Sequence, residues 1–350
     1  MSSPRQDAYR LLARLWLAEI DAPLAETLRG LPGFAEHIPA KVDAAWRDEM
    51  AAEYQRVFAQ NVHPYESMFV GDDLMLNSDA TRRVAALYDL GDFAPTAARI
   101  AAADHLGIEL LFMAHLIAAE EEGRDPTTAR RLQARFLGEH LLWWAPVCAL
   151  TVARLAPHPI YGALAQLTWE LALADASLSP LRDKTLTQPL PEGEEPERLE
   201  PSPLGRGQGE GLDAGSEAPE RREPSPPGRG QGEGLDAEGE SLGQVVRALL
   251  TPARVGVFLC REDVRRVGRT LGLPTPLGDR FAMLRALFEA AAQFDLLPAL
   301  LDALDALWRD ADAGVAALTA EAPAWSPYGE QWRARLAAGR GLTSEIRKSL

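Results

Sequence analysis

The chain has 350 residues, a formal net charge of −15 and a sequence pI of about 4.9. Such an acidic balance disfavours nucleic acids and anionic membrane surfaces as partners; it suits a basic partner or serves solubility alone. No apolar run approaches the roughly 18 residues that a membrane-spanning helix needs. Residues 1–10 also lack the apolar segment of a secretory signal. We therefore expect a soluble, cytoplasmic protein with no integral membrane segment.

Helical periodicity covers most of the chain, because apolar residues recur at spacings of three and four and Ala, Leu, Arg and Glu dominate. The predicted helices are residues 4–18, 41–58, 79–90, 104–122, 127–141, 143–156, 159–176, 242–251, 262–271, 278–292 and 297–308. Residues 255–259 are the only short run that could form a strand instead. We predict an all-α helical bundle of about ten or more helices.

A segment rich in Pro, Gly and Glu interrupts this pattern at residues 184–241. It has too few large apolar side chains to offset the entropy of ordering, so we predict a long disordered insertion. It contains a two-copy repeat, since residues 196–203 recur nearly unchanged at 219–226. The predicted organisation is a helical core at 1–183, this linker, a C-terminal helical part at 242–320 that packs on the core, and a tail at 321–350.

Two cysteines, Cys148 and Cys260, lie in apolar surroundings and form no CxxC pair, which argues for core residues and against a thiolate metal site. The chain has no nucleophile elbow, no phosphate-binding loop and no metal-ligand cluster. We therefore predict no enzymatic activity, no catalytic residue, no metal and no cofactor. A faint helix-turn-helix pattern at 261–274 is insufficient to predict DNA binding in so acidic a chain.

The first informative motif joins the end of a helix, residues 53–58, to the loop that follows it. Pro64 fixes an extended turn there, so Tyr65 can bury its ring while Glu66 and Ser67 bind backbone donors. Phe69 adds an aromatic side chain in the same loop. This loop is either a rigid plug or one wall of a groove that binds a peptide.

The second motif spans residues 104–116. Asp104 stands where a helix begins and can cap its free N–H groups. His105 and Glu109 are four residues apart, so they share a helix face; two ligands are too few for a metal, which leaves a surface ion pair or a polar contact to a bound peptide. His115 has the spacing of a partly buried core histidine.

The third motif spans residues 133–146. Pro146 suits the first turn of a helix. Trp143 and Trp144 point in different directions, so one is expected to pack inside and the other to lie at a groove or interface. The alternative is that both aromatic side chains only hold two helices together.

In this order, the motifs between residues 53 and 144 resemble the TorD/DmsD/NarJ family of redox-enzyme maturation chaperones, and the flanking helices extend the resemblance over about 9–176. The resemblance implies an all-helical, non-enzymatic chaperone. Such a protein binds the twin-arginine signal peptide or the apo-form of a molybdopterin oxidoreductase subunit, prevents premature export and assists cofactor insertion. Asp104 and His105 match the family's Asp-His motif, although Ala103 stands where the family often has proline.

The predicted peptide-binding residues combine carboxylates that attract a basic leader with apolar side chains that hold it. They are Tyr65, Glu66, Ser67, Phe69, Asp104, His105, Glu109 and Trp143. The expected partner is a molybdoenzyme catalytic subunit or its signal peptide, and the protein itself is a monomer or homodimer. The alternatives are a NarJ-like assembly factor for a cytoplasm-facing membrane reductase subunit and a helical scaffold without a client.

Overall fold

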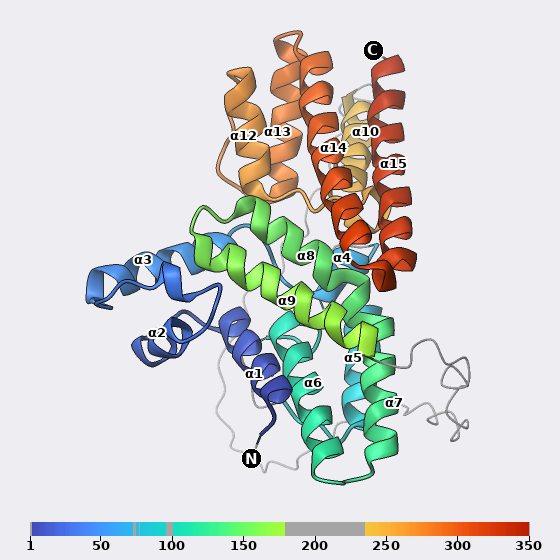
Figure 1. Ribbon diagram of the computed structural model, residues 1–350. Helices are drawn as coiled ribbons and strands as arrows, with labels where there is room; N and C mark the ends of the chain where they lie inside the picture. The colour runs from blue at the N-terminus through green and yellow to red at the C-terminus, as the bar shows by residue number, and fades with distance from the viewer. Residues whose placement is uncertain (1, 73–74, 77, 96–100, 179–234, 350) are drawn as a thin grey trace, which may run out of the picture.

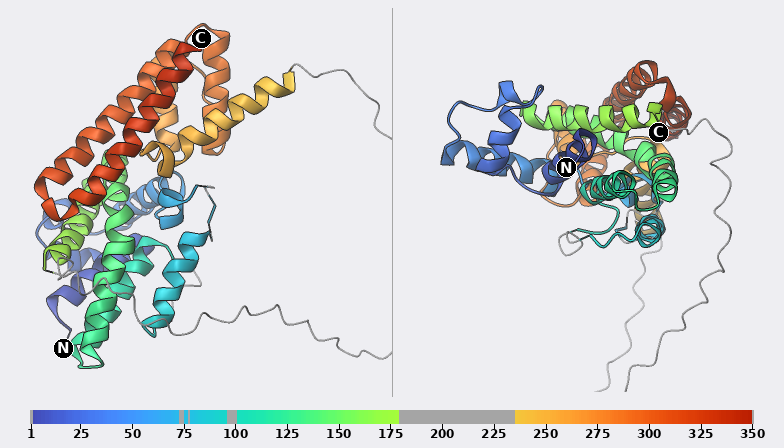
Figure 2. Two further views of the ribbon diagram at one scale, coloured as in Figure 1. Left: turned by 90° about the vertical axis from the view of Figure 1, so that its right-hand side faces the viewer. Right: turned by 60° about the horizontal axis from the view of Figure 1, so that its bottom comes forward.

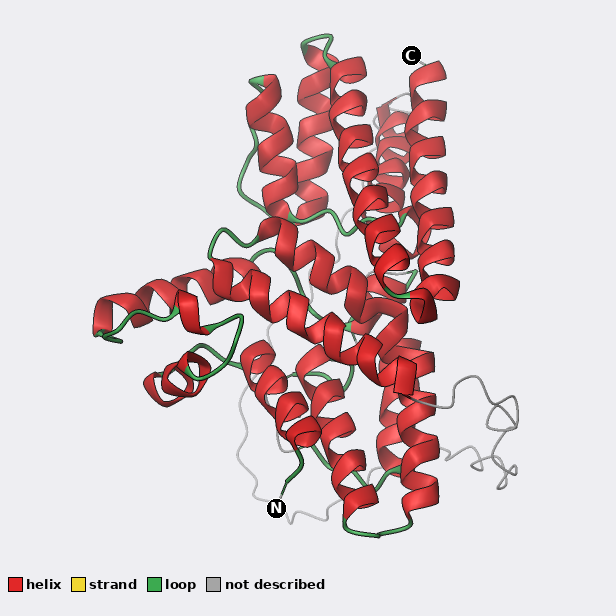
Figure 3. Cartoon of the chain, in the orientation of Figure 1, coloured by secondary structure: helices red, strands yellow, loops and turns green. Residues whose placement is uncertain are grey.

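The computed structural model describes residues 2–72, 75–76, 78–95, 101–178 and 235–349. Within these ranges every named element is a helix (Figure 3), which confirms the all-α prediction. The predicted disordered insertion lies outside the described residues as far as residue 234. Helix α10 (Leu235–Leu250) begins at its C-terminal end.

The N-terminal unit ends at residue 178. Its elements are α1 (Pro4–Leu17), α2 (Ala22–Arg29), η1 (Ala35–His37), α3 (Ala44–Tyr54), η2 (Gln55–Ala59), α4 (Glu66–Val70), α5 (Asp79–Leu90), α6 (Leu106–Glu121), α7 (Pro126–Phe136), η4 (Leu137–Leu141), α8 (Leu142–Leu155) and α9 (Pro159–Leu178). Both η2 and η4 are single π-helical turns. The sequence did not predict α2 or α4, because helices of eight and five residues are too short to establish a periodic pattern.

Helix α6 lies at the centre of this unit and is apolar around most of its circumference. Its first turn contacts α1 so closely that a Cβ at Gly107 would lie 2.5 Å from Cγ of Leu17 and 2.9 Å from the carbonyl oxygen of Ala13. Glycine is therefore required at this position for α1 and α6 to pack together.

The segment from Pro126 to Leu155 forms one continuous helical stretch of 30 residues, α7–η4–α8, where two helices were predicted. Pro146 consequently lies inside a helix and not in its first turn. By length and composition this stretch is the one candidate membrane span among the described residues, but 72% of its most apolar window is buried inside the protein. Such burial is typical of a core helix.

The C-terminal unit stands above α8 and α9 as an upright bundle (Figures 1 and 2). Its elements are α10 (Leu235–Leu250), α11 (Pro252–Val255), α12 (Arg261–Leu271), α13 (Arg280–Gln293), α14 (Leu297–Glu321), η5 (Pro323–Trp325) and α15 (Ser326–Lys348). Helix α14 is longer than predicted, and most of the predicted tail is α15. The two helices form an antiparallel pair (Figure 2), joined by ion pairs that include Arg340–Asp305 at 2.8 Å.

Three aromatic side chains at the start of α15 and just before it bind main-chain carbonyls of the long helix. Nε1 of Trp325 donates to the Leu142 carbonyl at 2.7 Å, and Nε1 of Trp332 donates to the Trp143 carbonyl at 2.6 Å. The Leu142 carbonyl needs an outside donor, since Pro146 has no N–H to offer it. The third donor, the Tyr328 hydroxyl, binds a carbonyl in the π-helical turn.

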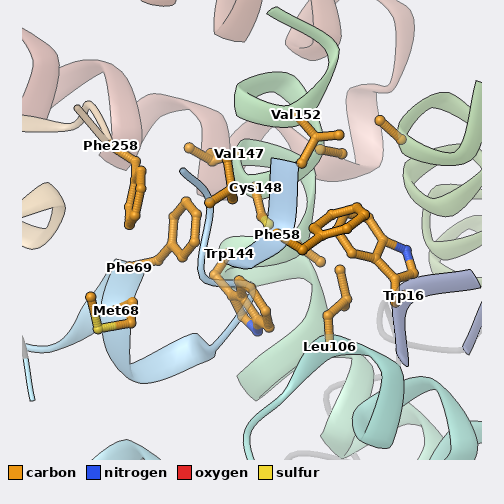
Figure 4. Close-up of a cluster of buried hydrophobic side chains, with 14 of the residues drawn as sticks. Trp16, Phe58, Met68, Phe69, Leu106, Trp144, Val147, Cys148, Val152 and Phe258 are labelled. Atoms are coloured by element: carbon orange, nitrogen blue, oxygen red, sulfur yellow. The ribbon is translucent and has the colours of Figure 1, made fainter. Parts of the chain in front are cut away.

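Residues 256–260 run beneath the C-terminal unit as a buried segment between α11 and α12, with no strand partner, so the strand alternative for 255–259 is wrong. In Figure 4, Phe258 from this segment lies beside Phe69 from α4; their ring centroids are 4.9 Å apart and the rings are nearly parallel. Cys148 and Cys260 are free and buried, as predicted. The two units thus share a continuous apolar core.

Candidate functional site

Two segments about forty residues apart in the chain meet at the start of α6. The Glu66 N–H donates to the Asp104 carbonyl and the Leu106 N–H donates to the Pro64 carbonyl, each at 2.9 Å. An antiparallel β-bridge between Tyr65 and His105 completes the junction. The first and second sequence motifs therefore form a single structural unit.

Asp104 is fully buried and its Oδ2 accepts a hydrogen bond from the Ser67 N–H at 2.9 Å. It therefore caps α4 and not α6, which corrects the prediction. The cap of α6 is His105, whose Nδ1 accepts from the Gly107 N–H at 3.1 Å. Burial lowers the pKa of His105 to about 4, so its ring is neutral at pH 7.

Glu66 connects this unit to the third motif. Its carboxylate oxygen Oε2 lies 2.7 Å from Nδ1 of His140, and both side chains are almost completely buried. The sequence motif predicted a backbone partner for the Glu66 side chain, and that was wrong. His140 belongs to the π-helical turn η4, and π-turns inside helices occur frequently at functional sites.

Glu109 is the third buried carboxyl group and accepts a hydrogen bond from Nε1 of Trp144 at 3.2 Å. Burial raises the pKa of Glu109 well above its ordinary value, and the negative charges of Glu66 and Asp104 raise it further. Burial and the neighbouring charges therefore both favour the protonated form of Glu109. His105 and Glu109 form no ion pair with each other, so the surface ion-pair alternative is wrong.

Three buried atoms in this network have no protein partner: the Ser67 hydroxyl, Oδ1 of Asp104 and Oε1 of Glu109. Unsatisfied buried polar atoms are uncommon and costly, typically about 1–3 kcal/mol each. The described residues offer no group of three or more His, Cys, Asp or Glu placed to hold a metal ion. The network is thus an interior polar cluster with spare hydrogen-bonding capacity.

Most of the predicted peptide-binding residues are buried within this cluster or beside it, including Phe69. Tyr65 is half-buried, with its ring edge-on to that of His105 at 4.9 Å between centroids. Trp143 is also half-buried, but Tyr328 and the Arg335 guanidinium cover its ring. Trp144 is in the core, as predicted for one of the two tryptophans, whereas Trp143 packs against α15 of the same chain.

None of the eight predicted residues lines either of two clefts found on the described part of the molecule. One cleft, of about 300 Å³, lies along α6 beside Phe93 and His115. The other, of about 320 Å³, lies between α8 and α14 beside Leu150 and Val315. The geometry of the loop at residues 63–67 therefore favours the rigid plug over the wall of an open groove.

Sequence reasoning assigned no role to His140 or to the Trp144 indole, although both belong to the third motif. The available signal was a histidine within an apolar helical stretch, where an unpaired polar ring would be costly. The acidic partner of His140 could not be identified from the sequence, because Glu66 lies 74 positions away in the chain.

Residues 17–149 match the family described as the nitrate reductase delta subunit. The matched segment runs from the end of α1 into α8 and contains the complete buried network. A search of curated proteins found no match to the chain.

Proposed function

We propose, because residues 17–149 match the nitrate reductase delta subunit family, that the protein binds the signal peptide or apo-form of a molybdopterin oxidoreductase subunit in the cytoplasm. It acts through binding alone. It holds the immature subunit, prevents premature export, and is displaced when the enzyme folds around its cofactor. No covalent step is involved.

The observation that supports this proposal is the convergence of all three motifs on one network. Buried carboxyl groups contribute little net stability compared with well-packed apolar residues, so a network of them is more readily explained by a need for one defined shape. Here the shape is that of the loop at residues 63–67, which Asp104 and His140 bind from two sides. The network therefore acts as the internal frame of a client-binding surface.

The outer side of this frame offers Tyr65 as its partly exposed aromatic residue. Burial raises the pKa of the Tyr54 hydroxyl to about 12, with smaller contributions from Glu19 and Tyr65. A basic leader followed by an apolar segment would meet the carboxylate of Glu19 and the ring of Tyr65 there. Glu66, Asp104 and Glu109 are buried beneath this surface and hold its residues in position.

Calorimetry with a synthetic twin-arginine signal peptide from a molybdoenzyme catalytic subunit of the same genome tests the proposal. We expect Tyr65→Ala to weaken binding about tenfold, equivalent to about 1.4 kcal/mol. Phe294→Ala removes an aromatic side chain that is 57% exposed in the C-terminal unit, so it serves as the control and should bind like the original protein. Equal affinity of the Tyr65→Ala variant would rule out this surface.

A client that stays in the cytoplasm is the second candidate, favoured by the family description itself, which names a nitrate reductase subunit. A leaderless apo-subunit distinguishes the two candidates. Retention of that subunit without affinity for the isolated leader would indicate a NarJ-like assembly factor. Binding of neither would leave the helical scaffold as the remaining explanation.

A further inference from the structure

The larger of the two clefts lies where the units meet, with α8 of the core on one side and α14 of the C-terminal unit on the other. Its volume is about 320 Å³, and its apolar lining includes Val147, Leu150, Ala311 and Val315. Ligand pockets usually enclose about 300–1,000 Å³, so a cleft at the low end of this range suits a few apolar side chains of a bound peptide.

The cleft is open because α14 presents a glycine opposite a large side chain of α8. A Cβ added to Gly314 would lie 3.5 Å from Cδ2 and 3.6 Å from Cδ1 of Leu150, which are ordinary van der Waals distances. Glycine is required at Gly339 of α15, by contrast, because an added Cβ would collide there with the indole of Trp308. Helix packing therefore does not require the space beside Gly314.

Asp310 lines this cleft, is exposed, and has no hydrogen bond or ion pair within the described ranges. The other aspartates of α14 each pair with an arginine of α15: Asp302 with Arg347, Asp305 with Arg340 and Asp312 with Arg333. Asp310 thus places a free carboxylate beside an apolar surface.

The two arginines that line the cleft already have acceptors. Arg154 donates to the buried carboxylate of Asp263 at 2.8 Å and to the Phe258 carbonyl at 3.2 Å. Arg266 donates to the other oxygen of that carboxylate at 2.7 Å. Two carboxylates therefore balance the two guanidinium groups around the cleft. Apolar burial is the main attraction it offers, and Asp310 is the charge that remains available to a ligand.

The wall of the cleft continues into the support of the loop at residues 63–67. Phe258 lines the cleft and stacks on Phe69 of α4, with 4.9 Å between ring centroids (Figure 4). Helix α4 begins at Glu66, directly after Tyr65. The cleft and the surface around Tyr65 are thus separate surfaces on one apolar core.

We propose that this cleft binds the apolar segment of the client's leader, and that Asp310 accepts a hydrogen bond from a basic side chain next to that segment. The inference rests on the proposed function and adds a second contact to the one at Tyr65. Burial of apolar side chains supplies affinity, while the carboxylate favours a basic neighbour over an acidic one. Since α14 forms one wall, the C-terminal unit takes a direct part in client recognition.

Calorimetry with the same synthetic leader peptide tests the cleft. Gly314→Leu fills it, and the affinity should fall about tenfold because the apolar segment loses its place. Gly341→Leu is the matched control: it adds the same side chain to α15, at a position where no atom lies within 4 Å of the added Cβ. The control should bind like the original protein.

Asp310→Asn tests the charge separately from the shape. Binding should weaken about threefold at 50 mM sodium chloride and less at 500 mM, because salt screens an exposed carboxylate. Asp312→Asn removes the same charge from an aspartate already paired with Arg333, so its affinity should not change. Asp310 is exposed, so Asp310→Asn decides the result if Gly314→Leu does not fold. Unchanged affinity of Asp310→Asn at both salt concentrations would overturn the proposal.

A second peptide, in which serines replace the apolar segment of the leader, distinguishes direct binding from an indirect effect. Gly314→Leu and the original protein should bind this peptide equally, since the segment that enters the cleft is absent. If Gly314→Leu lost the same factor of affinity for both peptides, the substitution would act through the fold, and the cleft would not be the binding site.

The outcomes separate this inference from the proposed function. If the original protein does not bind the leader, both fail. If Tyr65→Ala weakens binding and Gly314→Leu does not, the cleft assignment alone fails. Analytical ultracentrifugation covers the remaining occupant: a dimer that Gly314→Leu converts to a monomer, with unchanged leader affinity, would assign the cleft to a second copy of this chain and overturn the proposal.

Discussion

The N-terminal core and the C-terminal unit hold the same long helix in place by different chemistry. On the core side, the π-turn residue His140 and the neighbouring Trp144 bind buried carboxyl groups. On the other side, indole and phenol donors of the C-terminal unit bind backbone carbonyls of the same stretch. The first set of contacts depends on protonation and the second does not. We call the first set the frame, since it fixes the shape of the loop at residues 63–67, and the second set the attachment, since it stabilises the junction with the C-terminal unit.

The attachment should be the more sensitive to truncation. Trp332 is fully buried, and Trp332→Ala removes the ring as well as its hydrogen bond to the Trp143 carbonyl. We expect a loss of about 3–5 kcal/mol in the free energy of unfolding, as for other large-to-small core substitutions. Denaturant titration followed by circular dichroism measures it.

Trp332→Phe separates the two contributions, because phenylalanine keeps most of the apolar contact and loses the donor. The expected loss is about 1–3 kcal/mol, since the Trp143 carbonyl then has no indole partner. A loss as large as that of Trp332→Ala would mean that the hydrogen bond, and not packing, dominates the attachment.

The frame should instead respond to pH through Glu109. The folded-state pKa of Glu109 is raised above its unfolded value near 4.5, so the folded state binds the proton more tightly. Stability from this group is therefore fully present below about pH 4.5 and is lost as pH rises toward the folded pKa, by about 1.4 kcal/mol per pH unit. Glu109→Gln cannot lose a proton, so its stability relative to the original protein should increase over that range.

Chemical denaturation at pH 4.5, 6 and 7.5 checks this prediction. Trp332→Phe provides the comparison from the C-terminal unit, where the lost donor is neutral and the difference should not change with pH. A constant difference between Glu109→Gln and the original protein across all three pH values would contradict the protonated, buried carboxyl group.

The smallest effect is expected for the exposed ion pairs between α14 and α15. Arg340→Gln breaks the pairing with Asp305 on a surface where water and salt screen both charges. The thermal midpoint should change little, and less at 1 M sodium chloride than at 50 mM. A large shift that persists at high salt would show that this pair contributes more than its exposure indicates.

The sequence predicted the helical content well and the details of the long helix poorly. The periodicity in residues 126–155 is continuous enough to indicate helix, but Pro146 suggested that a new helix begins near it. In the structure the helix continues through Pro146, and the Trp325 indole donates to the Leu142 carbonyl in place of the N–H that proline lacks. For the site, the motifs identified Glu66, Asp104 and Glu109 as important polar residues. They did not show that these side chains point inward, because α6 is apolar on nearly all sides and its pattern marks no outer face.

What the sequence determined by itself was local: which segments are helical, where Gly107 and Pro64 occur, and which motifs resemble a chaperone family. The tertiary structure alone decided the partners, since Glu66 meets His140 and Trp325 meets Leu142 only through packing between distant segments. The physical reason is that helical periodicity arises from backbone geometry within a few residues. Hydrogen-bond partners and pKa shifts, in contrast, depend on which surfaces the folded chain brings together and removes from water.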